Sequence, residues 1–417
     1  MVQHVTVAQI IDSAPARVVV TRDGAGSVTD ASFDLSGLPR VDAMLTGRPV
    51  IEVPGLVERL CGICPAAHHL AGIRALEALS GITQIPPTAM AVRRLLHYAS
   101  VIAIHIVGVI VTDQVEALTL RRFAKAGMTA AGSPGHFPAT AVPGGVVAPS
   151  DPELCQVCVD LVPEAMAAAI RLVERSLGTS IPADHFDGAD IALVDDSGNL
   201  DLFGMALRAV AADGTTVIEA ALPAQWDQII AEANPGSSTP KPYILALGSR
   251  TGAYRVGPVA QLRVAPLPTP QAGYYQQQWR QSGGGAASAR TIIILHAVET
   301  IAELITNPNL VNVEVAVPWT PDIPAGTGVG WVDGARGLLV HRYVSTMDGR
   351  MESSTILTPT AQNEIWLSEL LREAAHGDMA TAGLEDAIRE ADPCLPCSSA
   401  PAGTMDLVID TIESEGQ

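Results

Sequence analysis

The sequence predicts an α+β protein with a large helical core bundle and small peripheral β-sheets. Apolar residues recur at helical spacing over several long segments, and short β-branched runs flank Gly-containing turns near the N-terminus and near residue 348. Hydrophobic residues make up 48% of the chain and aromatic residues only 4%, so Ala, Val, Ile and Leu must fill the interior. We find no internal repeat and no long linker, and we therefore expect residues 1–417 to form one integrated domain.

The predicted elements follow one another in a clear order. Residues 16–34 predict an N-terminal β hairpin, because two β-branched runs surround a Gly-rich turn. Helical patterns over about 64–178 and 286–308 predict the core. Within the first of these ranges we expect three helices, over residues 64–79, from 86 to about 118, and over 152–177.

The remaining segments are less regular. Residues 180–265 hold short apolar runs broken by Asp-Gly and Pro, which predicts a mixed, partly β excursion. Residues 328–357 predict a hairpin that turns at Asp348-Gly349. A C-terminal segment, 392–400, is followed by a tail, 401–417, whose apolar and polar residues alternate from Met405 to Thr411. This alternation favours an edge strand, with a free acidic tail as the alternative.

The composition argues against nucleic acid and membranes as partners. The net charge is −19 and no cluster of Lys or Arg offsets it, so the chain repels phosphate backbones and anionic lipid surfaces. The longest apolar run, 99–112, is shorter than the roughly 20 residues of a membrane-crossing helix, and His105 interrupts it. The N-terminus shows no basic segment followed by an apolar stretch, so we expect no membrane span and a cytoplasmic location.

All six cysteines fall in CxxC pairs, at Cys61/Cys64, Cys155/Cys158 and Cys394/Cys397. Such a loop brings two thiolates to one metal, and thiolates select zinc, iron, nickel or copper. A structural zinc clip or a redox disulfide is the alternative at this point. Zinc ribbons place their cysteine pairs roughly 15 to 20 residues apart. The outer pairs here lie near opposite ends of the chain, which weakens the zinc interpretation.

The residues around the outer pairs resemble two signature segments of nickel–iron hydrogenase large subunits, RxCGxCxxxH and DPCxxC. The first is ERLCGICPAAH, ending at His68, and the second is DPCLPC, ending at Cys397. The resemblance continues through the middle of the chain, over His136-Phe137-Pro138, 142–146 (VPGGV), 254–258 (YRVGP), Ala335-Arg336-Gly337 with His341, and 360–363 (TAQN). The CGICP segment followed by two histidines is most similar to the cytoplasmic, bidirectional branch linked to NAD(P) or deazaflavin. The resemblance implies the hydrogenase large-subunit fold.

The resemblance also implies a nickel–iron cluster with carbon monoxide and cyanide on the iron. Cys61 and Cys394 would be terminal nickel ligands, and Cys64 and Cys397 would bridge the two metals. A terminal thiolate such as Cys394 can take the proton when dihydrogen is split. His68 is expected to donate a hydrogen bond to a bridging sulfur, with an ordinary core histidine as the alternative.

Two further positions would complete the site. Arg336 matches the family arginine that lies over the open metal position, and Asp113 matches the carboxylate that pairs with it. A surface strand arginine is the alternative for Arg336. Cys155 and Cys158 match no family ligand. Because ELCQVCVDLV has the pattern of an apolar helix, we expect them to be buried thiols, with an accessory metal or disulfide as the alternative.

Three positions depart from the family pattern. Ala400 stands where a histidine usually ends the trimmed chain and binds a structural magnesium or similar ion. Pro15 aligns with the usual first proton acceptor, and Asp42 stands in place of a glutamate ion ligand. We therefore expect an untrimmed tail and no ion beside Cys397, although Asp42 is the candidate ligand for one. Alternative proton relays are Asp12, Glu52 and Glu58.

The function that the resemblance implies is the reversible oxidation of dihydrogen to protons and electrons. No further set of four cysteines is left for an iron–sulfur cluster, which implies that the chain has an iron–sulfur small subunit for its partner. A flavin and iron–sulfur module that reacts with NAD(P) or deazaflavin is implied as well. A non-catalytic or hydrogen-sensing relative, with an altered ion site and proton exit, is the alternative, and a zinc-clipped structural protein is the third hypothesis.

Overall fold

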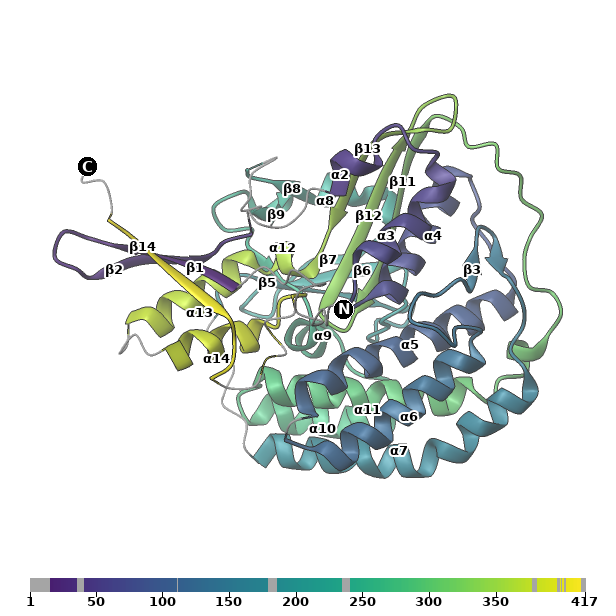
Figure 1. Ribbon diagram of the computed structural model, residues 1–417, viewed down its shortest axis with the longest axis horizontal. Helices are drawn as coiled ribbons and strands as arrows, with labels where there is room; N and C mark the ends of the chain where they lie inside the picture. The colour runs from purple at the N-terminus through teal and green to yellow at the C-terminus, as the bar shows by residue number, and fades with distance from the viewer. Residues whose placement is uncertain are drawn as a thin grey trace, which may run out of the picture.

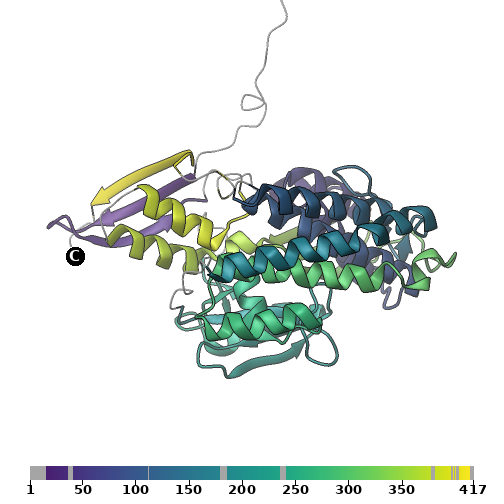
Figure 2. The same cartoon turned by 90° about the horizontal axis from the view of Figure 1, so that it is seen from below.

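The structure is a computed structural model that describes residues 16–35, 41–110, 112–178, 186–234, 241–376, 381–395, 398, 400 and 403–413. A bundle of long helices lies beside a three-stranded sheet (Figure 1). A second small sheet with two helices extends to one side of the bundle, as the view from below also shows (Figure 2). The expected α+β architecture, with a helical core and small sheets, is confirmed.

The bundle consists of α5 (Pro87–Val109), α6 (Gln114–Ala130), α7 (Pro152–Gly178), α10 (Pro270–Gln281) and α11 (Ala286–Leu304). α5 and α11 are apolar on nearly every side and are mostly buried, whereas α6 and α7 have one apolar and one charged face. α5, α6, α7 and α11 pack in a closed ring, each against the next, and α10 lies against α11. α5 is long and apolar enough to cross a membrane, but most of it is buried in this bundle.

One expected helix is broken. The pattern from residue 86 to about 118 forms two helices, because α5 ends at Val109 and α6 begins at Gln114. Asp113 lies at the junction, where its N–H donates to the carbonyl of Val109 and its own carbonyl accepts from Ala117, both at 2.9 Å. Both helices need an apolar face toward the bundle, so the hydrophobic pattern continues across the break and hides it.

The three-stranded sheet consists of β11 (Gly326–Gly334), β12 (Gly337–Ser345) and β13 (Met351–Leu357), all antiparallel. The turn expected at Asp348-Gly349 connects β12 to β13 and is confirmed. A second tight turn, at Ala335-Arg336, divides the first predicted strand into β11 and β12. This turn is what brings Arg336 to the end of the sheet.

Helix α4 (Pro65–Leu79) lies directly on β11, and two glycines make this approach possible. A Cβ atom at Gly328 would lie 2.2 Å from the carbonyl oxygen of Ala75, and one at Gly330 would lie 2.3 Å from the Ala75 nitrogen. No side chain fits into that space. Because Cys64 immediately precedes α4, the contact also fixes the first cysteine pair against the sheet.

The side sheet joins the two ends of the described chain. The expected N-terminal hairpin is confirmed as β1 (Ala16–Arg22) and β2 (Val28–Phe33). β14 (Leu407–Glu413) pairs in parallel with β1, which confirms the edge strand that the alternation in the tail predicted. α13 (Glu364–His376) packs on β2, and α14 (Thr381–Ala391) packs on α13, around a cluster of buried apolar side chains.

The remaining elements are short. The mixed region after α7 holds a four-stranded sheet in the order β10-β5-β6-β7, as the sequence predicted in outline. The elements not yet bounded are α2 (Val41–Leu45), α3 (Val53–Leu60), α8 (Trp226–Ile229), α9 (Pro258–Val264), α12 (Pro359–Gln362), β3 (Ala141–Val142), β4 (Gly145–Val146), β5 (Ala189–Val194), β6 (Ala206–Val210), β7 (Thr216–Ala221), β8 (Ile230–Glu232), β9 (Pro242–Ile244) and β10 (Tyr254–Arg255).

The approach of α4 to β11 gives a first testable prediction. We expect Gly330→Ala to lower the free energy of unfolding by at least about 1 to 3 kcal/mol, because the added methyl group must push α4 off the sheet. Denaturant unfolding of the purified full-length chain measures this. Gly108→Ala is the matched control, since a Cβ atom there meets open space on a helix. It should leave the stability unchanged or raise it by up to about 1 kcal/mol. A Gly330→Ala variant that is as stable as the wild type would contradict the prediction.

Candidate metal centre

Three cysteines from distant parts of the chain meet at one point. The Sγ atoms of Cys61 and Cys64 are 3.0 Å apart, and the Sγ atoms of Cys64 and Cys394 are 3.5 Å apart. Within the described residues they are the only group of three or more His, Cys, Asp or Glu side chains whose ligand atoms all lie within 4.8 Å of one another. All three are free cysteines. Cys397 lies outside the described residues, so its role as a ligand stays a prediction.

The backbone holds these cysteines at the ends of secondary-structure elements. α3 ends at Leu60. The next residue, Cys61, has an extended backbone, and Cys64 is the N-cap of α4. The N–H of Cys64 donates to Sγ of Cys61 at 3.3 Å, so the loop folds back on its own sulfur. The N–H of Cys394 donates to Oγ1 of Thr360 at 2.7 Å, which fixes the second cysteine segment.

The segment 360–363 links the parts of the site to one another. Besides the bond from Thr360 to the Cys394 backbone, Asn363 accepts from the N–H of Val256 at 2.8 Å and donates to the Val256 carbonyl at 3.1 Å. Gln362 accepts from the hydroxyl of Tyr254 at 3.2 Å. The sequence resemblance included TAQN without assigning it a role, and the structure shows that its side chains join backbone segments around the cysteines.

The three thiols strongly affect one another's protonation. Hydrogen bonds from Cys394 and Cys64 lower the pKa of Cys61 well below the usual range of a thiol. The interaction with Cys394 raises the pKa of Cys64, and the interaction with Cys61 raises the pKa of Cys394 to about 12. The three thiols titrate as one coupled group, in which Cys61 ionises first and Cys64 and Cys394 hold their protons more tightly. Because metals bind thiolates, metal binding must release these protons.

Arg336 lies at the tight turn between β11 and β12. Gly337 has a φ of 120°, and Gly257, in the loop before α9, has a φ of 101°. A Cβ atom at Gly337 would lie 2.5 Å from the nitrogen of Gly257, and one at Gly257 would lie 2.8 Å from the carbonyl oxygen of Arg336. The turn and the loop are thus in direct backbone contact, which sets the position from which the Arg336 side chain extends.

The carboxylate that pairs with Arg336 is Asp392. Nε of Arg336 lies 3.2 Å from Oδ1 of Asp392, whereas Asp113 pairs with Arg175 on α7 at 2.7 Å. The expectation that Asp113 supplies this carboxylate is therefore wrong. The expectation fails because of the break after α5, which makes Asp113 the N-cap of α6 and turns its carboxylate toward α7. The missed partner, Asp392, belongs to the DPCLPC segment, and its place directly before that cysteine pair was the available sequence signal.

Asp392 is held in its position by the end of α14. Its N–H donates to the carbonyl of Ile388 at 2.9 Å, and its φ of 46° lies in the left-handed region, the usual way for a helix to end. Nε of Arg290, on α11, lies 3.8 Å from Oδ2 of Asp392. The carboxylate thus stands between two guanidinium groups, which stabilise its ionised form.

A cavity of about 30 Å³ lies against the thiols and is lined by Cys64, Cys394, His68 and Arg336, among others. This volume is enough for a water-sized molecule or two. Nη1 of Arg336 is buried and has no hydrogen-bond partner in the described part of the chain. Nε of the same guanidinium pairs with Asp392, but a buried N–H without an acceptor is still costly. The thiolate donors and this unpaired N–H fit a metal cluster that carries negative charge.

The other candidate residues lie outside this cavity. Asp42 is on α2, which packs against β13, and its carboxylate is not part of the convergent cysteine group. Cys155 and Cys158 are buried in α7 as expected, and both are free. Burial raises the pKa of both thiols, that of Cys158 to about 12, so they are weak nucleophiles at neutral pH.

Of the alternative proton relays, Glu58 is held in a closed pair. Asp12 and Pro15 lie outside the described residues. His69 donates from Nδ1 to Glu58 at 2.7 Å, and Nε2 of His69 accepts the backbone N–H of Ala141 at 3.0 Å. Because Nε2 is an acceptor, this ring is neutral with its proton on Nδ1. The pair therefore anchors α3 to α4.

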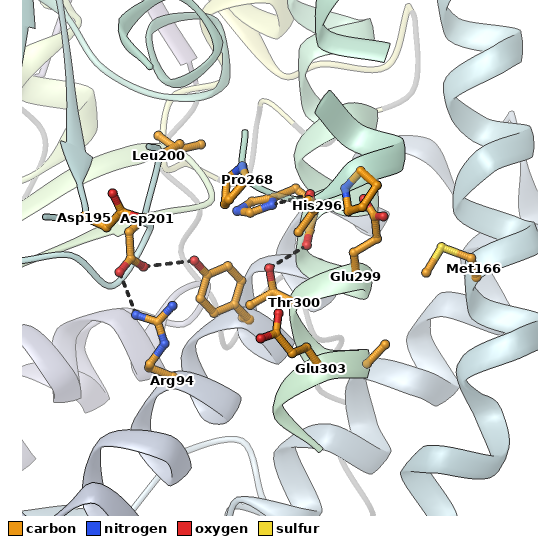
Figure 3. Close-up of a pocket in the computed structure, with 14 residues that line it drawn as sticks. Arg94, Met166, Asp195, Leu200, Asp201, Pro268, His296, Glu299, Thr300 and Glu303 are labelled. Atoms are coloured by element: carbon orange, nitrogen blue, oxygen red, sulfur yellow. Dashed lines mark hydrogen bonds and ion pairs between the residues drawn. The ribbon is translucent and has the colours of Figure 1, made fainter. Parts of the chain in front are cut away.

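A wider cavity, about 370 Å³, opens between α5, α11 and the loop after β5 and shares no residue with the cysteine cavity (Figure 3). Two of its charged groups, Arg94 and Asp201, pair with each other. Asp201 accepts from Arg94 at 2.7 Å and from the Tyr98 hydroxyl at 3.1 Å, and Thr300 donates to the His296 carbonyl at 2.8 Å. With no thiol in its lining, this cavity does not match the chemistry of the cysteine site.

Behind the Arg336 turn, Asp333 is fully buried at the end of β11. Gln261 donates to its Oδ1 at 2.6 Å, and the N–H of Leu193 donates to its Oδ2 at 3.2 Å. Burial nevertheless dominates and raises the pKa of the carboxyl to about 7.

This pKa predicts how the stability changes with pH. Between about pH 4 and 7 the carboxyl of Asp333 is protonated in the folded chain and ionised in the unfolded chain, so its contribution to stability falls as the pH rises. The full shift corresponds to roughly 4 kcal/mol. Asp333→Asn is neutral at every pH and should flatten this slope. Urea unfolding of both proteins between about pH 5 and 8 measures the difference, and equal slopes would show that Asp333 ionises normally.

The chain is similar to proteins of known function over most of its length. Residues 40–110 match the family described as nickel-dependent hydrogenase. NAD-reducing hydrogenase HoxS subunit beta of Cupriavidus necator is 28% identical over 96% of this chain and 95% of its own length. One chain of the F420-non-reducing hydrogenase vhu of Methanococcus voltae is 29% identical over 86% and 94%. The crystal structure of an NAD+-reducing nickel–iron hydrogenase in the H2-reduced state superposes with a TM-score of 0.80 at 28% identity, covering 91% of this chain and 95% of that chain.

Proposed function

We propose that the chain is a nickel-dependent hydrogenase large subunit and that it catalyses the reversible oxidation of dihydrogen to protons and electrons. The observation that carries the proposal is the convergence of Cys61, Cys64 and Cys394 beside the buried guanidinium of Arg336. Relatives that match nearly the full length of the chain are hydrogenase subunits.

Four cysteines would hold the nickel–iron cluster, with carbon monoxide and cyanide on its iron: Cys61, Cys64, Cys394 and, by its place in the motif, Cys397. The bound cluster would supply the redox-active metals at which dihydrogen is cleaved. The residues of the chain would then act around it. Sγ of Cys394 would accept the proton, and the guanidinium of Arg336 would stabilise negative charge inside a cavity too small for bulk water. Asp392 would orient the guanidinium.

The electrons need a route that this chain does not provide. Its only cysteines outside the two motifs are Cys155 and Cys158, which are buried in a helix and leave no set of four for an iron–sulfur cluster. We therefore propose that the chain assembles with an iron–sulfur small subunit, together with a flavin and iron–sulfur module that reacts with NAD(P) or deazaflavin. A NAD-reducing relative supports this assignment, and with it a cytoplasmic location.

Metal analysis gives the primary test of the proposed function. We expect purified protein to hold nickel and iron in near-equal amounts and to show infrared bands of iron-bound carbon monoxide and cyanide. Cys394→Ser should lose the nickel, because it removes a thiolate ligand. Cys155→Ser, which changes a thiol outside the site, should retain both metals. A preparation that contains only zinc would refute the hydrogenase proposal.

A second variant separates chemistry from assembly. Arg336→Lys keeps the charge but loses the planar guanidinium, so dihydrogen uptake should fall by about 100-fold or more while the metal content stays normal. Arg280→Lys is the control, because within the described residues the hydrogen bonds of Arg280 all go to the Leu262 carbonyl, away from the cysteines. Normal uptake by Arg336→Lys would place Arg336 outside the reacting site.

The tail gives a further prediction. We expect residues 401–417 to remain in the mature protein, because Ala400 lacks the imidazole of the usual trimming site and β14 pairs with β1 along its length. Ala400 packs against the apolar cluster around α13 and α14, which does not favour an ion there. Intact mass spectrometry of the metal-loaded protein tests this, and a chain that ends near residue 400 would contradict it. Ala400→His should add an ion that the wild type lacks. Equal ion content in both proteins would instead indicate other ligands, such as Asp42.

A further inference from the structure

A row of buried hydrogen bonds leads from the cysteine cavity into the protein. Nδ1 of His68 lies 3.0 Å from Nε2 of His341, and Nδ1 of His341 lies 2.7 Å from the hydroxyl oxygen of Tyr343. His341 and Tyr343 are fully buried on one face of β12, and His68 is 6% exposed. His68 lies one turn after Cys64 on α4 and lines the cavity with Cys64 and Cys394.

Only two proton arrangements satisfy this row, because each neutral imidazole has one N–H and one acceptor nitrogen. In the first, Tyr343 donates to Nδ1 of His341, Nε2 of His341 donates to Nδ1 of His68, and His68 carries its proton on Nε2. In the second, every bond is reversed and His68 carries its proton on Nδ1. The two arrangements therefore present opposite groups, an N–H or a lone pair, to the thiols.

The hydroxyl of Tyr343 decides between them. In the reversed arrangement its proton needs another acceptor, and no second hydrogen bond of this hydroxyl is found in the described part of the chain. α4 closes the space beside it, since a Cβ atom at Gly72 would lie 3.0 Å from the hydroxyl oxygen. A buried donor without an acceptor is costly, whereas the first arrangement leaves every donor of the row paired.

We propose that Tyr343 and His341 are positioning residues that hold the proton of His68 on Nε2, so that His68 presents an N–H donor to the cysteine cluster. Such a donor withdraws electron density from a thiolate sulfur and stabilises its negative charge. That consequence for the metal rests on the proposed function. The proton positions themselves follow from the protein alone.

The electrostatics agree with a neutral His341 and with a hydrogen-bond donor at the thiols. Burial lowers the pKa of His341 well below its usual value, so this ring is neutral under ordinary conditions. The pKa of Cys61 is lowered mainly by Cys394 and Cys64, and a hydrogen bond to His68 acts in the same direction. His69 offers an internal contrast, because its Nε2 accepts the N–H of Ala141 and its proton must therefore lie on Nδ1.

The test is nitrogen-15 NMR of the metal-free, full-length chain labelled at histidine, in which two-bond correlations distinguish the two neutral tautomers. His68→Gln and His341→Gln assign the signals by their loss. We expect Nε2–H forms for both rings in the wild type, and the Nδ1–H form for His69. Tyr343→Phe removes the hydroxyl that donates to His341, and His341→Leu removes the ring that donates to His68. In either variant His68 should become a mixture of tautomers. Tyr98→Phe, which removes another buried hydroxyl, should leave His68 unchanged.

Two results would overturn the proposal: an Nδ1–H or doubly protonated His68 in the wild type, or a His68 that keeps a single tautomer in both variants. A mixture in either variant supports it, and using two variants covers the case in which one fails to fold. Because the measurement uses no metal, its outcome is independent of the hydrogenase assignment. If the protein shows the expected tautomers but binds only zinc, the proposed function is refuted and the positioning role of Tyr343 and His341 is supported.

Discussion

The contact between α4 and β11 is the constraint on which the metal centre depends. Gly328 and Gly330 let the backbone of α4 pack directly on β11. This contact fixes the positions of Cys64 and His68 relative to the Arg336 turn. Arg74 strengthens this contact from within. Its guanidinium donates to the carbonyls of Trp331, Phe203 and Gly204 at 2.8 to 3.2 Å and lies 3.7 Å above the Phe203 ring. Burial lowers the pKa of Arg74 to about 9, which still leaves it charged at neutral pH.

Close backbone contacts and side-chain hydrogen bonds to the backbone join the other parts of the site. The Arg336 turn touches the Gly257 loop directly, and Asn363 bonds to both the N–H and the carbonyl of Val256. Thr360 fixes Cys394 in a similar way with one bond. Such contacts tolerate little displacement, because a shift of a fraction of an ångström either breaks a hydrogen bond or causes a clash. A rigid frame of this kind can keep the Arg336 guanidinium aimed at one point, as a preorganised electrostatic site requires.

The sequence predicted the local features of this site better than its long-range pairings. The cysteine pairs, the helix that follows Cys64 and the edge strand in the tail all depend on neighbouring residues, and their patterns were sufficient. The Asp113 pairing failed because it required the exact end of α5, and hydrophobic periodicity does not reveal a break between two helices that share an apolar face.

Other features could be found only in three dimensions. The Arg336 turn has no Asn-Gly or Asp-Gly signature, so the segment 328–347 resembled one continuous strand. His341 and Tyr343 look like ordinary alternating residues of β12, and only the arrival of His68 from α4 reveals their connection. The position of Cys397 and its neighbours stays a prediction, since these residues lie outside the described part of the chain.

The parallel pairing of β1 with β14 has a consequence for biosynthesis. A ribosome makes residues 16–64 early and residues 394–413 late, so the first hairpin waits with one edge open through nearly the whole of translation. The same late residues bring Cys394 to the first cysteine pair. Contacts this distant in sequence form slowly, because a long loop must close before they are made. The side sheet and the thiol cluster are therefore completed in the same final stage, and a nascent chain that lacks its last few dozen residues has neither.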